Sequence, residues 1–448
     1  MKYASQVFEY INRNRYFLAF LVCIHALYFG CALHFKGIYN ADSIEYLDTA
    51  VNLSEHGEVY NYTWSDTKRS EFYTLRPPVY GIFISIFKLI GNSDFIVLFF
   101  QNVLSFFSWI FFIRILKELG LQANLQLTVI LVLLFFPIQM IMVNCILADH
   151  LLQVWLLLSF GSIVFYLKTN KPVYILLHNI LLVLAVMTKP VMMYFWIPNL
   201  FFCIYLFFIH KRQMLVLVSS LLLPLSVFFW CSRNESKTGS FHFSSIKTQN
   251  ILDLNAGGVL SILEGDERAD SIKKSILISA ESITNYKERT EYITSSAIEI
   301  IQNNKCVYAY VHAKGMVNFM LSFGMVDMLE FVKSRPQQKD EISLVREIEL
   351  NGFEGLLNYF QETNLLKLLC MFSVVLCNVV MLASTVCFGF NRSFNPIIRI
   401  YVLVLIVYVC FVCGPGGYAR LKMCIMPLML LNMPTMISFI KNRFLPQN

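Results

Sequence analysis

Long apolar runs recur along the whole chain and constrain its fold more than any other feature. The chain has 448 residues, of which 57% are hydrophobic and only 15% are charged. A soluble domain usually carries about a quarter charged residues. Apolar runs of roughly 18 or more residues are long enough to cross a hydrocarbon core of ~30 Å. The sequence therefore predicts an all-α polytopic membrane protein.

We predict ten transmembrane helices, with interfacial helices in the first outer loop and a small helical outer loop domain. The predicted spans are 16–36, 95–116, 124–143, 147–167, 173–188, 190–209, 213–232, 365–388, 396–413 and 421–440. They divide the chain into an N-terminal transmembrane module (1–232), a large outer loop (233–364) and a C-terminal transmembrane module (365–448). The first run lacks a small-residue cleavage site, so we expect a retained span rather than a signal peptide.

Lysine and arginine in the short loops predict the orientation. Pairs of cations recur at alternate loops, from Arg13 and Arg15 before the first span to Lys441 and Arg443 after the last. Because cytoplasmic loops collect Lys and Arg, we expect both termini in the cytoplasm and a multi-pass protein of a bacterial plasma (inner) membrane. The net charge of +7 then reflects membrane orientation, and it gives no argument for a nucleic acid partner.

The unusual polar segments all fall on the expected outer side. In the first outer loop, 37–93, Asp42 precedes a short amphipathic helix over 43–55. A second apolar helix over 79–90 is too short to span and is expected to be interfacial. The other outer segments are the hairpins at 144–150, at Lys189 and at 414–422, and the loop 233–364. Polar groups that converge on one membrane face suggest a functional site there.

The 12 cysteines do not indicate a metal or disulfide framework. Only Cys306 falls well inside a polar segment, and no spacing of Cys and His is typical of zinc. Asp149 and His150, at the mouth of the fourth span, are different. They could bind a divalent cation, contact a phosphate, or simply begin a helix.

Four stretches of the chain carry a family resemblance. They read ADSIEYLDTAVNLSEHGEVY with RPPVYGIFISIFKLIG, then NCILADHLLQVW, FWCSRNESKTGSFHFSSIKTQNIL and GPGGYARLKMCIMPLML. In this order, they resemble membrane glycosyltransferases of the GT-C superfold that use polyprenyl-phosphate sugars, such as protein O-mannosyltransferases and the aminoarabinose transferase of lipid A. The order Tyr418-Ala419-Arg420 departs from the family's Arg-Tyr, and we expect this chain to lack the soluble C-terminal domain that some family members have.

The resemblance implies transfer of a sugar from a polyprenyl-phosphate donor to a glycan, lipid or protein acceptor on the outer face. The donor phosphate is already a good leaving group. An inverting single displacement therefore needs one carboxylate to take the acceptor proton and cations to hold the phosphate. Asp42 fits the base. The candidate substrate-binding residues are Lys189, Arg233, Arg420, Lys422, Arg76 and His150, and Asp149 is the candidate ligand of a divalent cation.

Each candidate also has a structural explanation. Asp42, with Glu45 three residues on, could cap the helix that follows it. Lys189 could be a snorkelling interface residue and Arg233 an interfacial anchor.

Two other functions remain open at this point. One is a transporter or flippase of a lipid-linked or envelope precursor, although no span carries an ion pair near its middle and no inverted repeat is evident. The other is a non-catalytic GT-C-like assembly partner, against which the presence of Asp42 argues.

Overall fold

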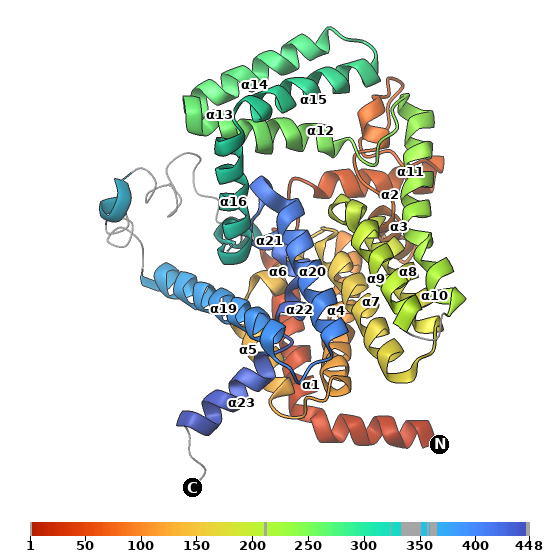
Figure 1. Cartoon of the computed structure of the whole chain (residues 1–448), viewed down its shortest axis with the longest axis vertical. Helices are drawn as coiled ribbons and strands as arrows, with labels where there is room; N and C mark the ends of the chain where they lie inside the picture. Colours follow the sequence, from red (N-terminus) through yellow and green to blue (C-terminus); the bar gives the residue numbers. More distant parts are fainter. Residues whose placement is uncertain are drawn as a thin grey trace.

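A computed structural model of the chain describes residues 2–209, 213–322, 324–332, 351–355, 358 and 365–444. Within these residues the regular structure is helical throughout (Figure 1). Seven helices are long and apolar enough to cross a membrane. The prediction of an all-α polytopic membrane protein is therefore confirmed.

The seven long apolar segments belong to α1, α4, α7, α9, α11, α19 and α20. Their ranges are Asn12–Phe35 within α1 (Lys2–Phe35), α4 (Asp94–Glu118), α7 (Asp149–Thr169), Pro190–Ile209 from η2 (Pro190–Phe195) and α9 (Trp196–Ile209), Met214–Thr238 from α10 (Met214–Ser220) and α11 (Leu222–Thr238), Met371–Phe390 within α19 (Leu365–Phe390), and Pro396–Gly416 from α20 (Pro396–Cys413) and η4 (Gly414–Gly416). All seven overlap predicted spans.

Three predicted spans take other forms. The span 124–143 is divided at Pro137 into α5 (Leu125–Phe135) and α6 (Ile138–Val143), because a proline interrupts helical hydrogen bonding. The span 173–188 is the 14-residue helix α8 (Val173–Val186). The span 421–440 is replaced by two segments, Ala419–Met429 and Met433–Phe444, which meet at 70° and make an eighth span only if counted as one. The number of ten stays a prediction.

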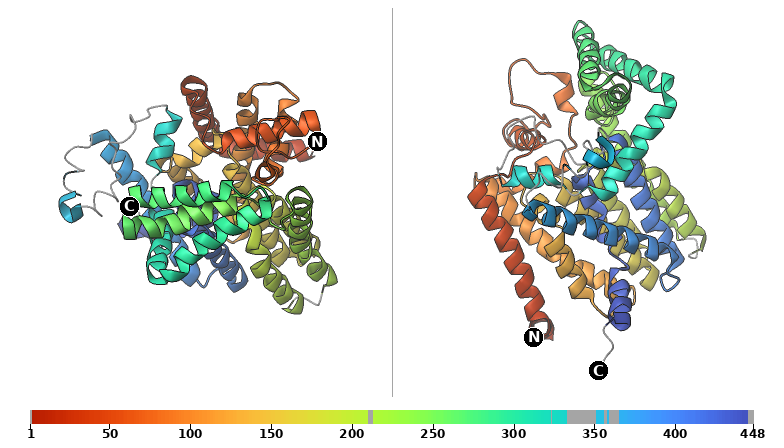
Figure 2. Two further views of the ribbon diagram at one scale, coloured as in Figure 1. Left: turned by 90° about the horizontal axis from the view of Figure 1, so that it is seen from above. Right: turned by 90° about the vertical axis from the view of Figure 1, so that its left-hand side faces the viewer.

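The molecule has two distinct ends. The start of α1 and the end of α23 (Met433–Phe444) both lie at the bottom of Figure 1, on opposite sides. Hydrogen bonds from Gln126 to Asn14 (2.6 Å) and from Asn124 to Ser438 (2.8 Å) connect the helices there. The right-hand view of Figure 2 shows the segment after α2 and helices α12–α15 gathered at the opposite end. We call these the terminal end and the loop end.

A small helical unit forms much of the loop end. Its elements are α12 (Ile246–Asn250), the π-helical turn η3 (Ile251–Ala256), α13 (Gly257–Glu264), α14 (Asp266–Glu281), α15 (Tyr286–Asn303) and α16 (Lys305–Leu321). Leu252, Ala256 and Ala297 belong to a separate apolar core within it. The short helix α17 (Met325–Phe331) follows. The predicted boundaries 1–232, 233–364 and 365–448 stay predictions, and most of 333–364 lies outside the described residues.

The first outer loop contains the two predicted short helices, α2 (Ser43–His56) and α3 (Val79–Lys88), with the 3-10 turn η1 (Ser70–Tyr73) between them. Gly57 ends α2 in the left-handed conformation at φ 67°, which glycine adopts without steric cost. Gly81 lets α3 approach α2 closely, because a Cβ there would lie 2.5 Å from Cγ2 of Thr49.

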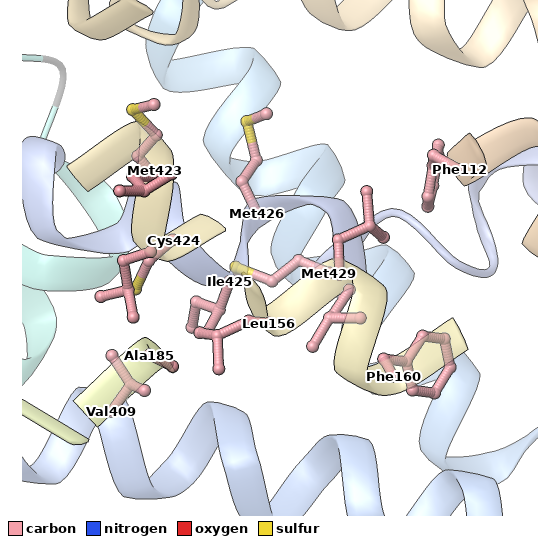
Figure 3. Close-up of a cluster of buried hydrophobic side chains, with 14 of the residues drawn as sticks. Phe112, Leu156, Phe160, Ala185, Val409, Met423, Cys424, Ile425, Met426 and Met429 are labelled. Carbon is pink, nitrogen blue, oxygen red and sulfur yellow. The ribbon is translucent and has the colours of Figure 1, made fainter. Parts of the chain in front are cut away.

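A buried apolar cluster holds the C-terminal part of the chain in place (Figure 3). Met423, Met426 and Met429, from η5 (Met423–Ile425) and α22 (Met426–Met429), pack in one core with Phe112 of α4 and Phe160 of α7. Methionine is flexible enough to fill irregular gaps of this kind. The cluster thereby anchors the short helix just before it, α21 (Ala419–Lys422), which carries Arg420.

Candidate active site

The carboxylate of Asp42 lies between two guanidinium groups from distant parts of the chain. Arg76 Nη2 donates to its Oδ1 at 3.1 Å, and Arg420 Nη2 donates to its Oδ2 at 2.7 Å. Asp42 stands at the N-cap of α2, but its side chain makes no capping hydrogen bond. The carboxylate therefore binds the two guanidinium groups and does not cap α2.

Asp149 forms a second ion pair next to the first. Its Oδ1 accepts a 2.6 Å hydrogen bond from Lys189 Nζ, and its Oδ2 lies 3.8 Å from Arg420 Nε. Arg420 is therefore shared by two carboxylates. Asp149, Lys189 and Arg420 are each less than a tenth exposed, so these charges stabilise one another away from bulk water.

Arg76, the other cation beside Asp42, also contacts further groups of the first outer loop. Its Nε donates to Oε2 of Glu45 at 2.5 Å, and its guanidinium lies 5.7 Å from the ring centre of Tyr46. Its backbone N–H donates to Asn61 Oδ1 at 2.9 Å. We name the six charged side chains the ion cluster: Asp42, Glu45, Asp149, Arg76, Lys189 and Arg420.

Local sequence explains how two of these cations are presented. Lys189 precedes Pro190 and is extended, at φ −150° and ψ 133°, because proline disfavours the helical conformation in the residue before it. Arg420 is placed by close backbone packing: a Cβ on Gly315 of α16 would lie 2.0 Å from the carbonyl oxygen of Gly414. Only glycine at position 315 permits α16 to approach η4 this closely.

The cluster determines the protonation of its central carboxylate. Burial on its own would raise the pKa of Asp42, but the positive charges of Arg76, Arg420 and Lys189 lower it to about 2. For Glu45 the balance is reversed, because burial raises its pKa more than Arg76 lowers it. Asp42 is therefore ionised at neutral pH, and its basicity in this state is low.

Three neighbours of the cluster, Asp327, Asn40 and Tyr46, have no signal in the sequence. Asp327 on α17 is 8% exposed, and burial raises its pKa to about 6 against the opposing charge of Arg420. Asn40 bridges to the same helix through a 3.3 Å hydrogen bond to Glu330. The hydroxyl of Tyr46 is buried and has no hydrogen-bond partner among the described residues. Asp327 is one of many acidic residues in the predicted outer loop 233–364, and nothing in its mostly apolar local sequence, 316–332, marks it as a site residue.

Three predicted site residues lie apart from the ion cluster. Lys422 Nζ donates to Met320 O at 2.8 Å and to Asn378 Oδ1 at 2.6 Å. The guanidinium of Arg233 donates to the carbonyl oxygens of Tyr73 and Val59, at 2.5 and 3.1 Å.

His150 is fully buried, and neither ring nitrogen has a hydrogen-bond partner in the described part of the chain. The structure thus brings together Asp42, Arg76, Asp149, Lys189 and Arg420, and not Arg233, Lys422 or His150.

The expected divalent cation at Asp149 stays an untested prediction. Among the described residues, no group of three or more His, Cys, Asp or Glu side chains could hold a metal ion. Both oxygens of Asp149 face cations, Lys189 and Arg420, and this arrangement does not favour a further cation.

No protein-family model and no curated protein matches the chain. Among solved structures, it is similar to the archaeal oligosaccharyltransferase AglB from Archaeoglobus fulgidus, in complex with an inhibitory peptide and a dolichol-phosphate, at 11% identity and a TM-score of 0.47. That alignment covers 97% of this chain and 53% of AglB, so the chain spans about half the length of that protein. It is also similar to ArnT from Cupriavidus metallidurans in the apo state, at 12% identity and a TM-score of 0.35, over 94% of this chain and 78% of ArnT. Scores this low do not decide an activity.

Proposed function

We propose that this chain is an integral membrane glycosyltransferase. It transfers a sugar from a polyprenyl-phosphate donor to a glycan, lipid or protein acceptor, by an inverting single displacement on the outer face of the membrane. The observation that carries the proposal is the position of Asp42, whose carboxylate lies between the guanidinium groups of Arg76 and Arg420. The four sequence stretches that resemble GT-C enzymes support the same function.

The cations of the cluster suit a phosphate as well as they suit carboxylates. Arg420 and Lys189 are buried and adjacent, because both lie against Asp149. A donor phosphate that entered here would accept charged hydrogen bonds from both, and such bonds are stronger than neutral ones. The same two cations would then stabilise the negative charge that develops on the departing phosphate.

Donor binding would also change the basicity of Asp42. In the free protein, Arg76, Arg420 and Lys189 lower its pKa to about 2. When the phosphate draws Arg420 and Lys189 toward itself, Asp42 loses part of that positive field and its pKa rises toward the ordinary range. The carboxylate then becomes a better general base at the moment when a sugar is present.

Sugar transfer takes place in a single step. The acceptor hydroxyl or amine gives its proton to Asp42 and forms a bond to the anomeric carbon of the sugar. The bond from that carbon to the phosphate oxygen breaks at the same time, and the electron pair leaves with the polyprenyl phosphate. Because the nucleophile enters opposite the leaving group, the anomeric configuration inverts.

Asp42→Asn tests this assignment. Asparagine keeps the shape of the side chain but removes its charge and its proton-accepting oxygen. We expect transfer, measured as release of polyprenyl phosphate in the presence of acceptor, to fall by on the order of 10²–10⁴. Donor binding should persist, because the phosphate is held by other residues.

Glu55→Gln is the matched control. It removes a carboxylate from the same helix at an exposed position, where the side chain is 65% exposed, and it should leave transfer unchanged. Transfer at the parental rate by the Asp42→Asn protein would show that Asp42 is not the base.

The flippase alternative is separated by a different assay. Proteoliposomes loaded with a polyprenyl-phosphate sugar and no acceptor would move the intact donor between leaflets if the protein were a flippase. The proposed enzyme releases polyprenyl phosphate only when acceptor is added, and it does not accelerate movement of the donor.

A further inference from the structure

A groove runs along α4 at its contact with α7, away from the ion cluster. Its volume is about 640 Å³. Leu104, Phe107 and Phe111 of α4 line it together with Leu158 of α7, and Arg114 and Lys117 stand at one end. Its walls are otherwise almost entirely apolar.

The end of the groove that carries Arg114 and Lys117 lies toward the terminal end of the molecule. The first residue of α4, Asp94, accepts a 2.7 Å hydrogen bond from Tyr39 in the first outer loop. The other end of α4 leads to the loop where Asn124 contacts Ser438 of α23. Arg114 and Lys117 therefore lie on the opposite side of the membrane from the proposed sugar-transfer site, and the groove is no part of that site.

Its length matches a lipid tail. From Leu104 to Lys117 the helix rises by about 20 Å, which exceeds one half of a ~30 Å hydrocarbon core. Gly161 helps to shape the wall, because a Cβ there would lie 2.6 Å from the ring of Phe111. The glycine lets that ring approach α7 closely.

The charge at the end of the groove favours an anion. Arg114 and Lys168 both form ion pairs with Glu118. Lys117 is exposed and has no ion-pair partner among the described residues. Three cations around one carboxylate leave a net positive charge, and basic pockets between transmembrane helices near the membrane surface bind anionic lipid headgroups.

We propose that this groove binds an anionic phospholipid, with one acyl chain along Leu104–Phe111 and Leu158 and the headgroup phosphate on Arg114 and Lys117. The site recognises both the acyl chain of the lipid and the negative charge of its headgroup. A zwitterionic phospholipid with the same chains satisfies only the first requirement, and a soluble anion only the second.

Native mass spectrometry of the full chain in detergent tests the proposal. We expect phosphatidylglycerol to be retained about 25-fold more than phosphatidylcholine of identical chain length. Arg114→Gln with Lys117→Gln should lower phosphatidylglycerol to the phosphatidylcholine level, since each basic residue near the surface contributes about fivefold to the binding of an anionic lipid. Arg392→Gln is the matched control, because it removes an exposed cation away from the groove.

A groove-filling variant tests the tail. Leu158→Trp keeps every charge but occupies the groove, so it should abolish retention of both lipids. Equal retention of the two phospholipids by the parent protein would overturn the proposal without any variant. Unchanged phosphatidylglycerol selectivity in the Arg114→Gln, Lys117→Gln protein would also overturn it.

Discussion

Arg420 and Lys422 stand two residues apart on the short helix α21, and their surroundings are opposite. Arg420 lies against the carboxylates of Asp42 and Asp149. Lys422 is completely buried and donates to two neutral oxygens, those of Met320 and Asn378. Two positions along a helix are about 200° apart, so one cation faces the ion cluster and the other faces α16 and α19. Charge type alone therefore does not identify a ligand-binding residue on such a helix.

The largest effect should come from Arg420. Arg420→Met leaves two buried carboxylates without a shared partner, and breaking a buried ion pair costs about 3–5 kcal/mol. We expect donor affinity and the transfer rate to fall together, and the thermal midpoint of the detergent-solubilised protein to drop.

Arg420→Lys sharpens this test. It keeps the charge but loses the planar fork that contacts Asp42 and Asp149 at once. We expect stability to be partly restored and transfer to remain low. Full recovery of transfer by lysine would mean that charge at this position suffices.

The next largest effect should come from Asp327, which lies near Arg420. Its neighbours are Arg420, Asp149, Glu330 and Lys189, and its pKa is raised from 3.8 to about 6. The folded state therefore holds the proton more tightly than the unfolded state. The stability contributed by that proton is present below pH ~4 and is lost as the pH rises through ~6, a change on the order of 3 kcal/mol.

The stability that Asp42 contributes depends on pH in the opposite direction. Its lowered pKa of about 2 gives stability that is present above pH ~4 and lost only as the pH falls toward 2. Thermal unfolding between pH 4 and 7 should therefore report Asp327 and not Asp42. Asp327→Asn should flatten the dependence of the unfolding temperature on pH between 4 and 7. An unchanged dependence in this variant would show that Asp327 does not contribute to it.

The smallest effect on ligand binding should come from Lys422. Lys422→Met removes a cation that contacts no carboxylate among the described residues. We expect donor affinity to change by less than about twofold, whereas loss of a charged hydrogen bond to the phosphate would cost roughly 1.5–3 kcal/mol. A donor affinity lowered by that larger amount would show that Lys422 reaches the phosphate and that the two faces of α21 are not separate in function.

Much of the site could be predicted because its residues stand at the ends of apolar runs. Asp42, Asp149 and Lys189 each begin or precede a helix, and a charge is costly inside a membrane unless it is paired. The pairing itself could not be predicted, because it joins positions 42, 76 and 420 across nearly the whole chain. The sequence also could not show that Arg420 and Lys422 lie on opposite faces of α21, since a four-residue helix has no hydrophobic periodicity.

Two of the predicted spans are broken in the structure, and the reason is physical as well. A hydropathy window averages over Pro137, so 124–143 looks continuous although the helix breaks there. The same averaging hides the break after Met429, where the chain turns by 70°. Hydropathy measures whether a segment can enter the membrane, whereas its straightness depends on single residues.

That 70° turn has a consequence for how the protein is made. Domains of a growing chain fold roughly in the order of synthesis, so Asp42, Arg76, Asp149 and Lys189 emerge long before Arg420. Until then Asp42 has only one of its two guanidinium partners. The bent C-terminal pair then completes the charge balance by entering among helices already in place, anchored by its methionines. The segment that carries Arg420 thus completes the ion cluster, and a chain interrupted before residue 419 would retain an incomplete one.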